Sequence, residues 1–113
     1  MVAPIRGEVW LIDLNPVRGH EQAGRRPALV VSDDLFNQGP AGLVIVLPIT
    51  STVRRIPSHV EVVPPEGGLK VRSAVLCDGV RSISTDRLQA RWGQVSRRTM
   101  GAVENALRFL MRL

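Results

Sequence analysis

A chain of 113 residues suits a single domain spanning residues 1–113, with room for one hydrophobic core and no second domain. The composition, 44% hydrophobic and 22% charged, is that of a soluble globular protein, and the apolar runs are too short to cross a bilayer, so a membrane protein is excluded. The net charge is +5 and every cation except Lys70 is an arginine, which indicates a phosphate-rich partner, although the same charge also suits a merely solvated surface.

The first two predicted elements are strands joined by a polar loop. Residues 8–14 partly alternate around a β-branched centre, and residues 27–31 form a continuous apolar run. Such a loop gains little stability from crowded charges, whereas binding and catalytic groups often lie on loops held by rigid elements. We therefore predict a functional site in this connection. Its polar residues are Arg18, His20, Glu21, Gln22, Arg25 and Arg26.

Short strands separated by glycine and proline turns follow this loop. Residues 41–49 form the most apolar stretch and predict a central strand that ends at Pro48, with Thr50 at its edge. A turn or short helical piece is predicted at residues 84–87. Further strands are predicted at residues 60–63, 73–77 and 88–95.

The apolar period changes near the C-terminus, where one amphipathic helix is predicted. Ser96 is a suitable N-cap, and Glu104 lies one i,i+4 step before Arg108. The positions expected to face the core are Met100, Val103, Leu107 and Leu110. Together the elements predict a mainly β domain, a compact antiparallel sheet or small barrel with one substantial helix.

The start of the chain and its cysteine content bear on location and cofactors. Residues 1–7 lack the long apolar stretch of an export signal, so we expect a cytoplasmic protein. Cys77 is the only cysteine, which excludes an internal disulfide. With His20 and His59 it is too sparse for a structural zinc site, and we expect neither a metal nor another cofactor.

The segment RGEVWLIDLNPVRGHEQAGRRPALVVS, residues 6–32, resembles the opening signature of the MazF/PemK family of toxin endoribonucleases from type II toxin-antitoxin systems. The likeness continues through LPIT, PSHVEV, AVLCD and VRSI and so covers nearly the whole chain. It implies an SH3-like small antiparallel barrel of the CcdB/MazF type with a C-terminal α-helix. It also implies a two-fold homodimer and a cognate antitoxin with an acidic, flexible tail.

The activity implied by the resemblance is metal-independent, sequence-specific cleavage of single-stranded RNA, which would inhibit translation and growth. The attacking group would be the 2′-hydroxyl, and the products would carry 2′,3′-cyclic phosphate and 5′-hydroxyl ends. By resemblance, Arg26 and Thr50 take the positions of the family's catalytic arginine and threonine. Glu21 matches the glutamate of the family's Gly-x-Glu-Gln pattern and is the preferred proton acceptor, with His20 as its competitor.

Each of these residues also has a purely structural interpretation. Arg26 would pair with Glu8 or Asp13, Thr50 would cap a turn, and Glu21 would order its loop. Two other functions stay open for the same barrel: a non-enzymatic gyrase inhibitor of the CcdB type and a passive RNA-binding module. The combination of Arg26 with Thr50 favours the nuclease, because neither alternative needs both.

Further RNA contacts are predicted around this pair. Arg54 and Arg55 follow Thr50 in the chain and suit phosphate, while His59 either contacts RNA or closes a turn. The remaining candidates for RNA binding are Arg18, His20, Gln22, Arg25, Asp78 and Arg81. Gly79 stands where many family members carry glutamine, which puts cut-site preference in doubt.

Aromatic platforms for bases are expected to be scarce. The chain has no tyrosine and two residues each of tryptophan and phenylalanine. Most of Trp10, Phe36, Trp92 and Phe109 are expected in the core. We expect the planes of Arg18 or Arg25 to replace some of the stacking that single-stranded RNA normally receives.

Overall fold

The computed structural model describes residues 2–14 and 24–113. Within these ranges the strands are β1 (Glu8–Asp13), β2 (Arg25–Val30), β3 (Leu43–Thr50), β4 (His59–Val62), β5 (Ser73–Leu76), β6 (Arg81–Ser84) and β7 (Leu88–Gln94). The helices are α1 (Asp34–Gln38) and α2 (Arg97–Met111), with 3-10 turns at Glu66–Gly68, Cys77–Gly79 and Thr85–Arg87. None of the described helices is long and apolar enough to cross a membrane.

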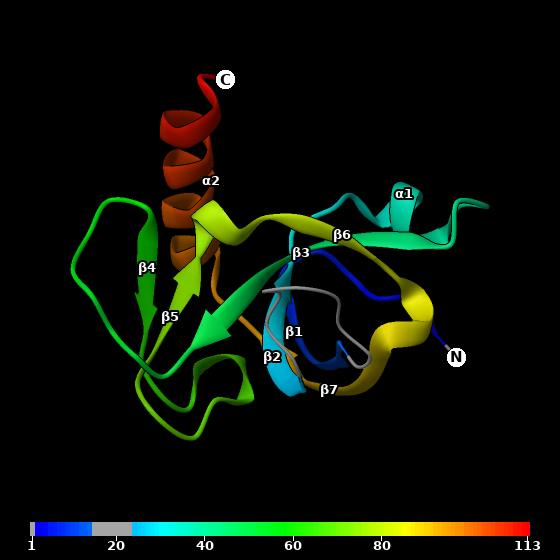
Figure 1. Ribbon diagram of the computed structural model, residues 1–113, viewed down its shortest axis with the longest axis horizontal. Helices are drawn as coiled ribbons and strands as arrows, with labels where there is room; N and C mark the ends of the chain where they lie inside the picture. The colour runs from blue at the N-terminus through cyan, green and yellow to red at the C-terminus, as the bar shows by residue number, and fades with distance from the viewer. Residues whose placement is uncertain (1, 15–23) are drawn as a thin grey trace.

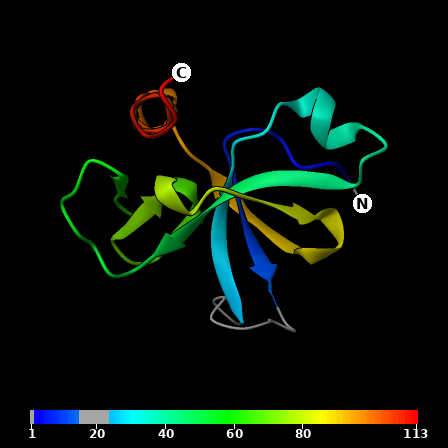
Figure 2. The same cartoon turned by 45° about the horizontal axis from the view of Figure 1, so that its top comes forward.

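The strands form one strongly curved antiparallel sheet in the order β4-β5-β3-β2-β1-β7, with β6 paired to β3 beside this path. Strand β3 runs through the middle, with β6 paired to its N-terminal part and β5, followed by β4, beside its C-terminal end (Figure 2). Helix α2 stands beside β4 and β5, away from α1 (Figure 1). The mainly β, barrel-like fold with a C-terminal helix is therefore confirmed, although the sheet is not closed: among the described strands, β4, β6 and β7 each pair with a single neighbour.

The six predicted strands are confirmed, with ends shifted by at most two residues. Two short elements were not predicted, β6 and α1. Strand β6 has the sequence RSIS, in which Ile83 is the only large apolar residue, and α1 is only five residues long. Neither is long enough to show a hydrophobic period. The helical piece predicted at residues 84–87 is the 3-10 turn Thr85–Arg87.

The prediction that the central strand ends at Pro48 was wrong, because β3 continues to Thr50. The N–H of Val31 donates to the Ile45 carbonyl, which turns the backbone groups of the odd-numbered residues of β3 towards β2. The nitrogen of Pro48 therefore faces the opposite side, where β3 passes from its pairing with β6 to its pairing with β5. A missing N–H is tolerated at this junction.

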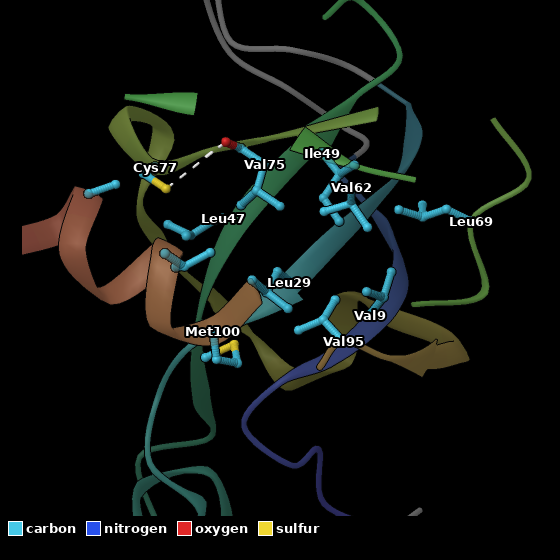
Figure 3. Packing of buried hydrophobic residues seen from close by; sticks show 12 residues of the cluster. Val9, Leu29, Leu47, Ile49, Val62, Leu69, Val75, Cys77, Val95 and Met100 are labelled. Atoms are coloured by element: carbon cyan, nitrogen blue, oxygen red, sulfur yellow. Dashed lines mark hydrogen bonds between the residues drawn. The ribbon is translucent and has the colours of Figure 1, made fainter. Parts of the chain in front are cut away.

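Alternation along the strands sends side chains into two cores. Val9, Leu29 and Leu47 lie in the core under α2, which Figure 3 shows together with Val75 and Met100. The second core lies on the other face of the sheet and contains Trp10, Ile12, Leu14, Ala28, Val30, Val44, Val46, Ile83 and Leu88. A sheet buried on both faces explains the continuous apolar runs in β2 and β3.

Helix α2 confirms the C-terminal prediction in most respects. The Ser96 hydroxyl accepts from the Thr99 N–H at 3.1 Å and caps the helix. Of the positions expected to face the core, Met100 and Val103 are buried and Leu107 is half-buried, whereas Leu110 is exposed. The i,i+4 spacing of Glu104 and Arg108 does not produce an ion pair: Glu104 binds Arg6 at 2.9 Å, and Arg108 donates to Asn105.

Candidate active site

Arg26 and Thr50 line the same hollow, although 24 positions separate them in the chain. Arg26 lies at the start of β2, and Thr50 is the last residue of β3. These strands pair with Ala28 opposite Pro48, and the same register carried two residues further sets Arg26 across from Thr50. The hollow has a volume of about 320 Å³. Antiparallel pairing therefore brings the two residues to one surface.

We call this feature the cationic hollow. Its described lining contains the cations Arg25, Arg26 and Lys70 and no carboxylate. The other lining residues are Pro27, Ile49, Thr50, Ser51, Leu69, Val71, Ser73 and Trp92. Cations gathered on one surface create a positive potential that attracts an anion such as a phosphodiester.

The hydroxyl of Thr50 is oriented by its own turn. Thr50 Oγ1 accepts a hydrogen bond from the Thr52 N–H at 3.1 Å. The predicted structural role, capping a turn, is therefore confirmed, but it uses only one of the acceptor sites of the hydroxyl. A hydroxyl has one proton and two lone pairs, so a bond accepted from Thr52 leaves the proton of Thr50 available to donate.

A second hollow, of about 350 Å³, lies on the other side of Thr50, and we call it the histidine hollow. It is lined by Thr50, Thr52, Arg54, His59, Leu76 and Asp78. His59 Nε2 is 3.7 Å from Asp78 Oδ1, and the His59 side chain is only 9% exposed. Its buried Nδ1 has no hydrogen-bond partner among the described residues. Three predicted RNA contacts, Arg54, His59 and Asp78, thus share one surface with Thr50.

The remaining predicted site residues divide into three groups. Arg25 lines the cationic hollow beside Arg26. Arg55 and Arg81 line neither hollow. Hydrogen bonds from Arg72 lower the pKa of the Glu61 carboxyl, and Arg55 lies close enough to add a smaller effect in the same direction. Arg81 lies on β6, opposite Val46 of β3. Those outside the described residues are Arg18, His20, Glu21 and Gln22.

The surroundings of Gly79 and Cys77 are tight. A Cβ on Gly79 would lie 3.2 Å from Pro48 Cδ, so the turn packs closely against the proline of β3. The Cys77 side chain is buried, and this burial, with a smaller contribution from Asp78, raises the pKa of the thiol to about 11. Cys77 therefore stays protonated at neutral pH and belongs to the core.

No group of three His, Cys, Asp or Glu suited to a metal ion occurs in residues 2–14 and 24–113.

The expectation that most aromatic residues lie in the core was wrong. Trp10 is 8% exposed, but Phe36 and Trp92 are each 39% exposed and Phe109 is 69% exposed. Trp92 and Lys70 line the cationic hollow, and neither was among the predicted site residues. The available signal was the composition of the β7 sequence LQARWGQ, whose polar residues mark an exposed edge strand rather than a buried one.

The arginine next to Trp92 is paired with a buried carboxylate. Glu8 is 5% exposed, and its carboxylate accepts from the Ile5 N–H at 2.7 Å, from Trp10 Nε1 at 3.0 Å and from Arg91 Nε. Burial alone would raise the pKa of Glu8, but these hydrogen bonds lower it below its usual value. Arg91 is thus held in an ion pair with Glu8, which reduces its capacity to bind a phosphate.

Comparisons with known proteins agree with this architecture. Residues 5–111 match the family described as PemK-like, MazF-like toxin of type II toxin-antitoxin system. The chain is 36% identical over 108 residues to endoribonuclease MazF9 of Mycobacterium tuberculosis, covering 91% of this chain and 92% of that protein. It is also 36% identical over 104 residues to endoribonuclease MazF of Staphylococcus saprophyticus, covering 90% and 86%.

Solved structures show the same fold. MazF from Deinococcus radiodurans superposes with a TM-score of 0.83 at 30% identity, and the match covers 100% of both chains. An endoribonuclease in complex with its cognate antitoxin from a mycobacterial species gives a TM-score of 0.79 at 26% identity, covering 100% of this chain and 97% of that one.

Proposed function

Because the chain belongs to the PemK-like, MazF-like toxins of type II toxin-antitoxin systems, we propose that it is an endoribonuclease that cuts single-stranded RNA at the cationic hollow. The observation that carries this proposal is the shared position of Arg26 and Thr50 in the lining of one hollow that also holds Arg25 and Lys70. A guanidinium and a hydroxyl converging on a cationic surface match the charge that develops when a phosphodiester is attacked.

The proposed reaction is an intramolecular transfer at phosphorus. The 2′-oxygen of the nucleotide before the cut bonds to phosphorus, its proton passes to a base, and the bond from phosphorus to the 5′-oxygen breaks. That oxygen takes up a proton from solvent and leaves as a 5′-hydroxyl, the base returns its proton to solvent, and the other product carries a 2′,3′-cyclic phosphate. This route requires no redox chemistry and no added nucleophile.

Arg26 and Thr50 have different roles in this scheme. The Arg26 guanidinium would bind the non-bridging phosphate oxygens and stabilise the extra negative charge of the phosphorane. The Thr50 hydroxyl would donate a hydrogen bond to the phosphate, because the bond it accepts from the Thr52 N–H leaves its own O–H free to do so. An arginine keeps its proton at neutral pH, so a separate proton acceptor is needed. Glu21 remains our proposed acceptor and His20 the alternative.

The histidine hollow extends the surface along which the RNA strand would run. Arg54 would contact a phosphate on that side of Thr50, and the pair of His59 and Asp78 would contribute polar groups to its wall. Arg25 would contact a phosphate on the opposite side. We further propose that the protein acts in the cytoplasm as a two-fold homodimer and is held inactive by an antitoxin whose acidic segment covers the cationic hollow.

The test is cleavage of a long single-stranded RNA by purified protein in the presence of EDTA, followed by sequencing of the ends. We expect cutting by the wild type, loss of cutting in Arg26→Ala and Thr50→Val, and normal cutting in Arg98→Ala, which removes an exposed arginine from α2. A substrate with 2′-deoxyribose at the cut should resist. Cleavage of that deoxy substrate, or complete inhibition by the chelator, would contradict the mechanism.

A further inference from the structure

Trp92 is the exposed aromatic residue that lies at the proposed site. It is 39% exposed, whereas Trp10, the other tryptophan, is buried in the second core. Trp92 lies on β7, an open edge of the sheet, and lines the cationic hollow together with Arg26 and Thr50. It also lines an adjoining hollow of about 390 Å³ with Gly68, Lys70 and Arg91. Lys70 and Trp92 therefore form the boundary shared by two connected depressions.

The backbone that carries Trp92 is held by direct contact with a glycine turn. Gly67 and Gly68 have φ values of 66° and 72°, a region that residues with a Cβ rarely adopt. A Cβ on Gly68 would lie 2.1 Å from the Trp92 carbonyl oxygen, and one on Gly93 would lie 2.7 Å from the Gly68 nitrogen. The backbones of the glycine turn and of β7 are therefore in direct contact, and a side chain at Gly68 or Gly93 would prevent this contact.

The same turn is tied to the rest of the molecule. Glu66 accepts from the Ser96 N–H at 2.9 Å and from the Thr99 hydroxyl at 2.5 Å, and Leu69 is 4% exposed in the core under α2. Lys70 follows this anchored leucine. An aromatic ring on a backbone fixed in this way is preorganised, so a ligand that stacks on it loses little conformational entropy to the protein.

Charge identifies the ligand that suits this ring. Lys70 makes no ion pair with any described residue, whereas Arg91, on the other flank of Trp92, is paired with Glu8. The platform therefore combines an aromatic face with a cation that no acid of the described residues pairs with. A planar base attached to a phosphate presents the complementary pair of groups.

We propose that Trp92 is a stacking platform for one unpaired base of the RNA adjacent to the scissile phosphate, and that Lys70 binds the phosphate of that nucleotide. This inference rests on the proposed nuclease function and adds a residue that recognises one base of the substrate. A base inside a duplex is stacked on its neighbours and cannot lie on Trp92, so the platform would select single-stranded RNA. Stacking strength would favour purines at that one position.

Steady-state cleavage of a short RNA tests the platform. Loss of one base–aromatic stack weakens binding by roughly 5- to 150-fold, so Trp92→Ala should raise KM by that factor with little change in kcat. Trp92→Phe should recover most of the loss, because it restores an aromatic face. Phe36→Ala is the matched control: Phe36 is also 39% exposed, but it lies on α1 near the start of β3, at the opposite end from Thr50.

Fluorescence provides a readout that does not depend on cutting. Subtracting the emission of Trp92→Phe from that of the wild type isolates Trp92, and a 2′-deoxy-substituted oligonucleotide should quench this difference signal with the same affinity that KM indicates. Wild-type cutting with an unchanged KM in Trp92→Ala would overturn the platform and leave the nuclease intact. Quenching without any cutting would retain the platform and reject the nuclease. A Trp92 signal shielded from acrylamide in the free protein would also overturn the proposal.

Discussion

Two hollows of similar size contain arginine and differ in how its charge is balanced. The cationic hollow, of about 320 Å³, is lined by Arg25, Arg26 and Lys70, and none of its described lining residues is an acid. The hollow beside the N-terminal half of α2, of about 360 Å³, is lined by Arg6 and Arg97 but also by Glu104, which binds Arg6 at 2.9 Å. An ion pair such as Arg6–Glu104 makes a small contribution to the stability of the fold, whereas a cluster of cations on a surface attracts an anion. Substitutions in the cationic hollow should therefore reduce cleavage, and substitutions in the hollow beside α2 should reduce only the free energy of unfolding.

The largest effect is expected for Arg26→Ala. Removing a donor aimed at developing charge typically costs about 3 kcal/mol, so cleavage should fall by roughly 100- to 1000-fold. Thermal unfolding should show whether the fold is retained, and single-turnover cleavage should show the loss in the chemical step. Arg6→Ala is the control from the other hollow, and similar losses of cleavage in both variants would remove the distinction between them.

Thr50→Val should have the next largest effect. Valine keeps the size of the side chain but removes the hydroxyl, and a hydrogen bond to a charged group contributes about 1.5–3 kcal/mol, so cleavage should fall by roughly 10- to 100-fold. Thr50→Ser, which keeps the hydroxyl, should retain most activity in the same assay. If the serine variant is as impaired as the valine variant, the hydroxyl is not the active group.

A smaller effect, on stability rather than cleavage, is expected for Glu8→Gln, which disturbs the buried carboxylate behind β7. Hydrogen bonds lower the folded-state pKa of Glu8 below 4.5, so its contribution is fully present above pH 4.5 and disappears as the pH falls through the folded pKa. We expect a loss of about 1–3 kcal/mol in urea unfolding at pH 7, and a smaller loss at pH 3. An equal loss at both pH values would contradict this linkage.

The smallest effect is expected in the hollow beside α2. Arg6 and Glu104 have side chains that are 36% and 37% exposed, and ion pairs of this kind contribute at most about 1 kcal/mol. A double-mutant cycle with Arg6→Ala and Glu104→Ala, measured by urea unfolding, should give a coupling energy in that range and should shrink at high salt. Cleavage should stay unchanged.

Much of the fold was readable from local pattern because its long elements carry a clear period. The strands at residues 8–14 and 27–31 and the helix after Ser96 were predicted to within a few residues. Elements without a period, β6 and α1, were missed. At Pro48 the general rule against proline inside a sheet gave the wrong strand end, because the exchange of β6 for β5 removes the need for its N–H.

The site was only partly readable. The family signature directed attention to Arg26 and Thr50, but it said nothing of Lys70 and Trp92, which lie in turns and on an edge strand far along the chain. Exposure decided the case of Trp92: a tryptophan of a small domain is expected to be mostly buried, but the place of β7 at the edge of the sheet leaves this one exposed.

The order of residues alone determined the strand and helix periods, the excess of arginine, and the motif that identifies the family, because each is a property of nearby positions or of composition. Tertiary structure decided which distant side chains meet. The register between β2 and β3 sets Arg26 across from Thr50, and the contact of Gly67 and Gly68 with Trp92 and Gly93 brings a ring and a lysine to the same hollow. Such meetings depend on pairing and close packing between remote segments, which no local pattern records.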